Sequence, residues 1–192
     1  MTTPVLHLLV GPNGAGKSTY VTRVLQPASP LLPFINADVI AAERWPDSQA
    51  EHAYEAARIA ASTRLQLLTD GRSFIAETVF SHPSKLELVG EAQARGYLVL
   101  LHVIMVPAEI TLHRVRHRVA HGGHAVPEHK IRERYDRLWP LVAQAAALAD
   151  YAEFLDNSLP EVPYRRIASF DRGRQTAKSS WPSWTPTPLT SL

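Results

Sequence analysis

The amino-acid sequence predicts a three-layer α/β fold, in which a parallel sheet of about five strands carries helices on both faces. Short apolar runs alternate along the chain with segments of helical periodicity, as expected of right-handed β-α-β units. The apolar run 5–10 indicates a buried strand and leads directly into a glycine-rich turn and a helix. At 192 residues, the chain is long enough for one core of this kind and short for two.

The glycine-rich stretch 11–19, GPNGAGKST, fits the phosphate-loop pattern G-x-x-x-x-G-K-[ST] at every fixed position. In such a loop the backbone N–H groups face anionic oxygens, and the helix that follows adds the positive end of its dipole. We expect Lys17 to reach the β- and γ-phosphates and Ser18 to bind Mg²⁺. The flanking strand and helix favour this interpretation over a glycine-rich turn without a ligand. The residues expected to bind the nucleotide are Gly11, Asn13, Gly14, Ala15, Gly16, Lys17, Ser18 and Thr19.

The first half of the chain continues with alternating helices and strands. A helix is expected over 16–25, where Pro27 and its neighbours break it, and a short strand over 32–36. An alanine-rich apolar stripe predicts a helix over 48–68, which opens with a capping-box pattern and ends at Gly71.

Carboxylates follow two of the expected strands. Asp38 comes just after the strand 32–36, and Glu77 and Thr78 follow the strand 73–76. Ligands of open α/β sheets bind outside the carboxyl ends of the strands, so we expect these three side chains to bind a substrate. Asp38 would orient or deprotonate an acceptor hydroxyl, and Glu77 would hold the acceptor or a metal-bound water. The alternative for Asp38 is a cap of the helix that follows.

The second half of the chain supplies the other strands. A helix after residue 81 closes at Gly96 and leads to the apolar run 97–106, which is typical of a central parallel strand. The strand 151–155 and an edge strand over 164–170 complete the expected sheet.

Two basic helices are expected to begin at Pro107 and Pro127 and to be joined by a Gly-Gly hinge at 122–123. Their arginines lie in the segment of about 114–137. We expect a mobile lid that excludes water, with a solvated basic face as the alternative. In the lid, Arg118 and Arg134 would neutralise charge on a transferred phosphoryl group, and His124 would contact a ligand.

The histidines of this region are spaced so that several share one helix face, which raises the hypothesis of a metal site. No carboxylate joins them in an H-E-x-x-H arrangement, and a surface helix explains them equally well. They are His113, His117, His121 and His124.

The composition changes after residue 171. The segment 172–192 is rich in Pro, Ser, Thr and Trp and lacks periodicity. We expect a flexible or loosely docked tail there, appended to one catalytic domain over 1–171. Trp181 and Trp184 are able to dock it on the body or on a partner.

Charge and composition limit the partners and the compartment. The net charge of +2 indicates neither a nucleic-acid nor a membrane partner, and the absence of cysteine excludes disulfides and thiol chemistry. No apolar run approaches the roughly 20 residues that span a bilayer, and residues 1–4 show no basic leader. We therefore expect a cytoplasmic protein.

A phosphate loop predicts that the protein binds a nucleotide, but it does not predict which reaction the protein catalyses. The sequence lacks the N-K-x-D motif of GTPase switches and the strand ending in Asp-Glu that motors carry. Acceptor-side carboxylates, clustered arginines and a lid favour a kinase that uses ATP or GTP with Mg²⁺ and phosphorylates a small molecule. Two alternatives stay open: a nucleotide-binding protein of a toxin–antitoxin pair with a different substrate, and a kinase of nucleic-acid ends.

Taken together, these residues make the chain resemble the zeta-toxin family of phosphate-loop kinases, in its compact form. The resemblance covers about residues 5–140 and is most specific in the A-E-T-x-F-S and G-G-H-x-V-P stretches. The matching stretches are 11–19, 36–38, 74–81, 96–97, 118–119, 122–127 and Ile131.

The resemblance implies a kinase whose best-studied relatives are toxins that phosphorylate UDP-N-acetylglucosamine and are held inactive by an antitoxin. It implies that Asp38 activates the acceptor, that Glu77 is a substrate-side carboxylate and that Arg118 contacts phosphate. The larger toxins carry a second lid arginine where this chain has Gly-Gly-His. The candidates for that second cation are His124, Arg132 and Arg134.

Overall fold

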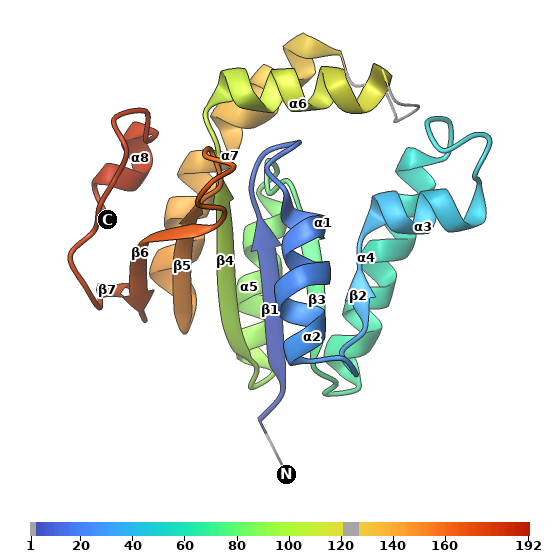
Figure 1. Ribbon diagram of the computed structural model, residues 1–192. Coiled ribbons are helices and arrows are strands. Elements are labelled where there is room, and N and C mark those ends of the chain that lie inside the picture. The colour runs from blue at the N-terminus through green and yellow to red at the C-terminus, as the bar shows by residue number, and fades with distance from the viewer. Residues whose placement is uncertain (1–2, 121–126) are drawn as a thin grey trace.

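The computed structural model describes residues 3–120 and 127–192, apart from the side chain of Arg118. Within these residues, seven strands form one sheet in the order β2-β3-β1-β4-β5-β6-β7 (Figure 1). The strands from β2 to β5 in this order pair in parallel, which confirms the predicted α/β sheet. Their bounds are β1 (Val5–Val10), β2 (Phe34–Ile35), β3 (Phe74–Thr78), β4 (Leu98–Met105), β5 (Tyr151–Asp156), β6 (Arg165–Asp171) and β7 (Arg174–Gln175).

Helices cover both faces of this sheet, as predicted. In Figure 1 the helical run after the phosphate loop lies in front of the sheet, α5 lies behind it, and α6 crosses above the carboxyl ends of the strands. None of the helices in the described ranges combines the length and apolarity needed to cross a bilayer. Their bounds are α1 (Lys17–Tyr20), the π-helical segment η1 (Val21–Leu25), α2 (Gln26–Ala28), α3 (Ala37–Arg44), α4 (Ala53–Thr69), α5 (Ser84–Ala94), α6 (Ala108–Ala120), α7 (Glu128–Leu148) and α8 (Thr187–Thr190).

The central strands are apolar on both faces, and each face has its own core. Side chains alternate along β1, so Leu6 and Leu8 join a core with residues of α4, α5 and α7, whereas Leu9 packs with α1 and η1. Val99 and Leu101 of β4 repeat the pattern on the larger core. Because both faces of β1 are buried, the strand is held in one position in the sheet. The point at which the phosphate loop begins is fixed as a result.

Three details differ from the sequence predictions. The helix after the phosphate loop continues through η1 to Ala28, since Pro27 stands in the first turn of α2, where its missing N–H is tolerated. The capping box does not form: α4 begins at Ala53, and the stacked rings of Trp45 and His52, 4.5 Å apart, stabilise turns before it. The expected edge strand, β6, pairs antiparallel with both β5 and β7, so β7 is the edge.

The segment 172–192 docks on the body rather than loosely. Trp181 packs edge-on against Phe154 with ring centroids 5.2 Å apart, and Leu189 is fully buried in the larger core. The backbone N–H of Ser180 donates to the carbonyl of Ile167 at 2.8 Å. The apolar residues of the segment 172–192 stand at irregular intervals between prolines. The sequence therefore shows no periodic pattern from which their burial could be predicted.

We predict that Leu189→Ala lowers the free energy of unfolding by about 2–5 kcal/mol, because it leaves a cavity in a closed core. Urea denaturation measures the change. Leu159, which is 51% exposed, gives the matched control, and Leu159→Ala should stay within about 0.5 kcal/mol of the wild type. Equal effects of the two substitutions would mean that the tail is undocked in solution.

Candidate phosphate-binding site

The phosphate loop follows β1 and lies directly on the neighbouring strand β4. A Cβ placed on Gly11 would lie 2.2 Å from the carbonyl oxygen of Ile104, so only glycine permits this approach. Gly16 caps α1 in the left-handed region, at φ 96°, where side chains are strained. The two glycines therefore let the loop pack closely on Ile104 and Asn157 at the N-terminus of a helix, which is a position that suits anion binding.

Three side chains from distant parts of the sequence hold the carbonyl groups of the loop. Asn157 Nδ2 donates to Ala15 O at 2.8 Å, and the Tyr164 hydroxyl donates to Gly16 O at 2.9 Å. Arg114 donates to the carbonyl oxygens of Gly14, at 3.3 Å, and of Asn157, at 2.9 Å. The N–H of Ala15 donates within the loop, to Pro12 O at 3.2 Å, so a ligand would bind the other N–H groups of the loop.

Sequence reasoning missed these three loop-holding residues, Arg114, Asn157 and Tyr164. Asn157 follows the end of β5, so the rule that selected Asp38 and Glu77 would have selected it as well.

Lys17, Ser18 and Glu77 come together at the mouth of the loop, although they arise from separate predictions. Lys17 Nζ donates to Pro12 O at 3.0 Å and lies 3.8 Å from Glu77 Oε1. Glu77 Oε2 accepts from Ser18 Oγ and from Asn36 Nδ2, each at 2.8 Å. Both members of the Lys17–Glu77 pair are about nine-tenths buried, which strengthens their attraction.

The oxygen atoms of Ser18 and Glu77 are the hard donors that Mg²⁺ prefers. Mg²⁺ commonly takes only one or two protein oxygens beside water and substrate phosphates, so this pair fits the ion. No group of three or more His, Cys, Asp or Glu side chains in the described ranges is placed to hold a metal. Of the four histidines in the metal hypothesis, His113 and His117 are exposed on α6, and the other two lie outside those ranges.

Asp38 stands in the first turn of α3, beyond the end of β2, with its side chain exposed. The cap of this helix is Asn36, whose Oδ1 accepts from Asp38 N at 2.7 Å. The alternative prediction, that Asp38 is the cap, is therefore wrong. Its carboxylate makes no hydrogen bond or ion pair within the part of the chain that the structure describes.

Glu77 and Thr78 are neighbours in β3 and consequently point to opposite faces of the sheet. Glu77 reaches the phosphate loop, whereas Thr78 Oγ1 accepts from Phe80 N at 3.3 Å and belongs to the face covered by α4 and α5.

Of the expected lid, α6 and the start of α7 lie above the sheet, whereas the rest of α7 runs down along the sheet and packs on its core (Figure 1). The Gly-Gly hinge, His124 and the Arg118 side chain lie outside what the structure describes. Arg134 is partly exposed on α7 and makes no hydrogen bond or ion pair with the described residues of the phosphate loop.

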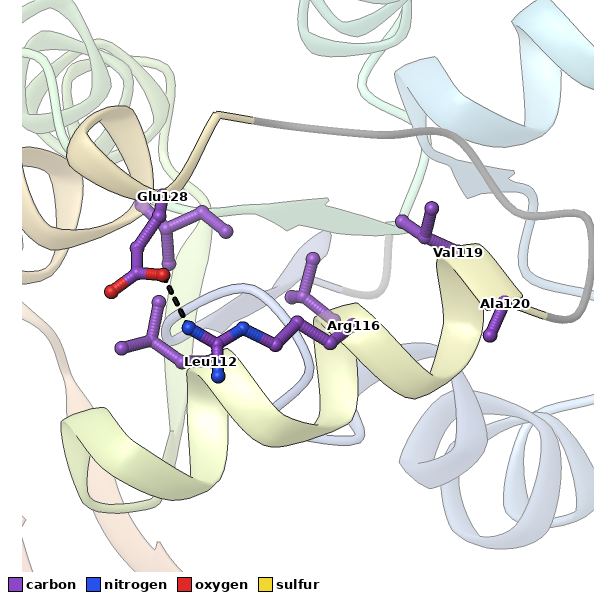
Figure 2. Close-up of a pocket in the computed structure, with 7 residues that line it drawn as sticks. Leu112, Arg116, Val119, Ala120 and Glu128 are labelled. Carbon is purple, nitrogen blue, oxygen red and sulfur yellow. Dashed lines mark hydrogen bonds and ion pairs between the residues drawn. The ribbon is translucent and has the colours of Figure 1, made fainter.

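A pocket of about 390 Å³ opens between α6 and α7, and Figure 2 shows Arg116 reaching across it to Glu128. Val115, in its lining, also lies 3.6 Å from the place of a Cβ on Gly14, so α6 packs directly on the phosphate loop.

A chain of buried polar side chains lies beneath the helix that follows the loop. His7 Nδ1 is 3.1 Å from His102 Nε2, and His102 Nδ1 is 2.7 Å from Glu153 Oε1, which also accepts from the Tyr20 hydroxyl at 3.1 Å. With Glu153 ionised, His102 donates through Nδ1 and accepts from His7 through Nε2. The ring of Tyr20 contacts that of Tyr164, with centroids 5.0 Å apart, which connects the chain to the loop-holding residues.

Burial sets the protonation of this polar chain. Burial lowers the pKa of His7 to about 4, and the electrostatic effect of the nearby His102 acts in the same direction. Burial and the carboxylate of Glu153 raise the pKa of the Tyr20 hydroxyl above its ordinary value. Burial opposes ionisation of Glu153, but hydrogen bonds from His102 and Tyr20 leave its pKa below the ordinary value. His7 is therefore neutral at pH 7.

Comparisons with known proteins agree with this geometry. A family model described as an AAA domain matches residues 6–141. No curated protein sequence matches the chain.

Among solved structures, a chain of the AvrRxo1-ORF1:-ORF2 complex with ATP has a TM-score of 0.72 at 17% identity, over 91% of this chain and 60% of that one. A chain of the PezAT chromosomal toxin–antitoxin system of Streptococcus pneumoniae gives 0.63 at 14% identity, over 87% and 72%. A gluconokinase from Sinorhizobium meliloti 1021 gives 0.53 at 17% identity, over 84% and 89%. At these identities the likeness shows a shared fold.

We predict that Gly16→Ala lowers the free energy of unfolding by about 1–3 kcal/mol, because the residue is held at positive φ and the new Cβ would lie 2.6 Å from Asn157 Nδ2. Gly90 in α5 is the control, since nothing lies within 4 Å of its Cβ position. Gly90→Ala should raise the free energy of unfolding by about 0.5–1 kcal/mol. Chemical denaturation tests both substitutions. An unchanged free energy of unfolding in Gly16→Ala would contradict the loop conformation.

We also predict a pH effect from His7. Between pH 6.5 and about 4, the unfolded chain binds a proton at this position and the folded chain does not, so stability falls as the pH falls. Thermal denaturation from pH 6.5 to 4.5, above the range in which Glu153 contributes, should show a shallower decrease in Tm for His7→Gln than for the wild type. The exposed His129 provides the control, and His129→Gln should leave the slope of Tm against pH as it is in the wild type. If His129→Gln reduced this slope and His7→Gln did not, the pH effect would not come from His7.

Proposed function

The chain belongs to the AAA domain family, and on that premise we propose that it is a Mg²⁺-dependent kinase that transfers the γ-phosphate of ATP or GTP to a hydroxyl of a small acceptor. The observation that carries the proposal is the group formed by Lys17, Ser18 and Glu77 at the mouth of the phosphate loop. One ammonium and two kinds of oxygen donor, converging beside a helix N-terminus, match what a bound triphosphate and its metal require.

In the proposed reaction, the amides of residues 11–19 and the ammonium of Lys17 bind the phosphates and offset their charge. Ser18 Oγ and the Glu77 carboxylate would hold Mg²⁺, which neutralises charge on the transferred group. Asn36 fixes Glu77 through the 2.8 Å hydrogen bond, so the carboxylate is oriented in advance.

Asp38 is our candidate for the residue that orients the acceptor hydroxyl and takes its proton. It stands beyond the carboxyl end of β2, beside β3, and its carboxylate faces solvent rather than a described cation. The basic lid is our candidate source of further positive charge, with Arg118 and Arg134 next to the transferred group. Thr78 and His124 are proposed to contact the acceptor.

The zeta-toxin resemblance favours a nucleotide-linked sugar such as UDP-N-acetylglucosamine as the acceptor. The fold shared with a chain of the PezAT toxin–antitoxin system supports the proposal of an antitoxin-like partner protein. A second candidate is a nucleotide-binding toxin component with another substrate, because a chain of the AvrRxo1-ORF1:-ORF2 complex also shares the fold. The net charge of +2 does not favour a kinase of nucleic-acid ends.

We predict that Asp38→Asn reduces phosphate transfer from labelled ATP into a metabolite extract by at least about 10²-fold, since the acceptor loses its general base. Nucleotide affinity, measured by calorimetry with Mg²⁺, should stay within about two-fold because Asp38 does not contact the loop. Lys17→Ala should weaken both transfer and nucleotide binding.

The exposed Asp47 is the matched control, and Asp47→Asn should leave both quantities unchanged. Undiminished transfer in Asp38→Asn would remove the proposed role of this carboxylate. Nucleotide binding without transfer by the wild type would favour the second candidate, and no binding of any nucleoside triphosphate would overturn both.

A further inference from the structure

Two positively charged side chains belong to the face of the sheet opposite the helix that follows the phosphate loop. Arg64 belongs to the core-facing side of α4 and is only 7% exposed. Lys85 is partly buried in the first turn of α5. The two charges interact, because burial and then the guanidinium of Arg64 lower the pKa of the Lys85 ammonium.

Neither charge has a counter-charge within residues 3–120 and 127–192. No hydrogen bond or ion pair joins Arg64 or Lys85 to any described side chain or carbonyl. A buried guanidinium without an acceptor is costly, and proteins normally pair such a group with an anion. The juxtaposition of two unpaired cations doubles this requirement.

The guanidinium of Arg64 nevertheless remains in contact with solvent. The described side-chain polar atoms that are both enclosed and unpartnered belong to Asn13, Thr111, Trp139 and Thr185, and none belongs to Arg64. Its nitrogens are therefore not fully enclosed by the described residues, which leaves them open to an anion from solvent. A guanidinium presents its donors in a planar fork that suits two oxygens of one phosphate or carboxylate.

The position of the pair relates it to the candidate active site. Lys85 lies at the N-terminus of α5, which starts shortly after β3 ends, and that helix end favours anions. Thr78, at the end of β3, belongs to the same face as the pair, whereas its neighbour Glu77 reaches the phosphate loop on the other face.

We propose that Arg64 and Lys85 form an oxyanion subsite that binds a phosphate or carboxylate group, carried by the acceptor alcohol or present as free phosphate. The assignment to an acceptor rests on the proposed kinase function, whereas the subsite itself does not. An acceptor bound in this way would be an anionic alcohol, with its charged group on the α4–α5 side of β3 and its hydroxyl toward the phosphate loop.

Thermal denaturation with inorganic phosphate tests the subsite. All proteins carry Lys17→Ala, which weakens anion binding at the phosphate loop. Phosphate at about 100 times its Kd should raise the Tm by several degrees in this background. Adding Arg64→Met should abolish the increase and also raise the Tm in phosphate-free buffer, because an unpaired buried charge is removed.

The exposed Arg58, on the same helix, is the matched control, and Arg58→Met should keep the full response to phosphate. Arg64→Lys and Lys85→Met should each retain a reduced response, which guards against a folding defect in Arg64→Met. Equal stabilisation by phosphate with and without Arg64→Met would overturn the proposal, as would a lower Tm of Arg64→Met in phosphate-free buffer.

The source of the anion is tested with Lys17 intact. A metabolite extract is separated on an anion exchanger, and each fraction is offered to the enzyme with labelled ATP. Label that enters the retained fraction supports an anionic acceptor if, at limiting extract, it falls at least about tenfold in Arg64→Met and stays at the wild-type level in Arg58→Met. Label confined to the unretained fraction overturns the acceptor assignment. No transfer in any fraction refutes the kinase proposal, while the phosphate titration still decides the subsite.

Discussion

The structure depends most on the close contact between the phosphate loop and the strand beside it. Gly11 lies so near the carbonyl of Ile104 that the loop has no freedom to move toward β4. On its other side, Asn157 and Tyr164 donate to the carbonyls of Ala15 and Gly16. These contacts hold the loop in place from both sides. Its conformation therefore depends on packing as much as on the loop sequence.

The carboxylate at the end of β3 also depends on the residues packed around it. Glu77 would repel a triphosphate if it stood alone, but its neighbours are an ammonium, a hydroxyl and an amide. Asn36 performs two tasks, since its amide nitrogen holds Glu77 and its oxygen caps the helix that carries Asp38. One side chain thereby couples the orientation of the metal-side carboxylate to that of the acceptor-side helix.

Much of this fold was predictable because its signals are local. The strands are short apolar runs, and the phosphate loop is a contiguous motif, so both appear in the sequence in order. Asn157 and Tyr164 were missed because they act on residues more than a hundred positions away. The place of Asn157 directly after β5 was a local signal, but no local signal marks Tyr164. The burial of Leu189 was not predicted because the proline-rich segment 172–192 has no periodic pattern of apolar residues. The unpaired charge of Arg64 was also hidden, since an arginine within an alanine-rich helix looks like a solvent-facing residue, as Arg58 of the same helix is.

The distance in sequence between the phosphate loop and its supports has a consequence for synthesis on the ribosome. The loop emerges at the start of translation, but Asn157 and Tyr164 follow it by 142 and 148 positions. A nascent chain that ends before them carries the motif without the side chains that hold its carbonyls. Nucleotide is therefore expected to bind only after most of the polypeptide has left the exit tunnel, which makes ligand binding a late event in the biogenesis of this protein.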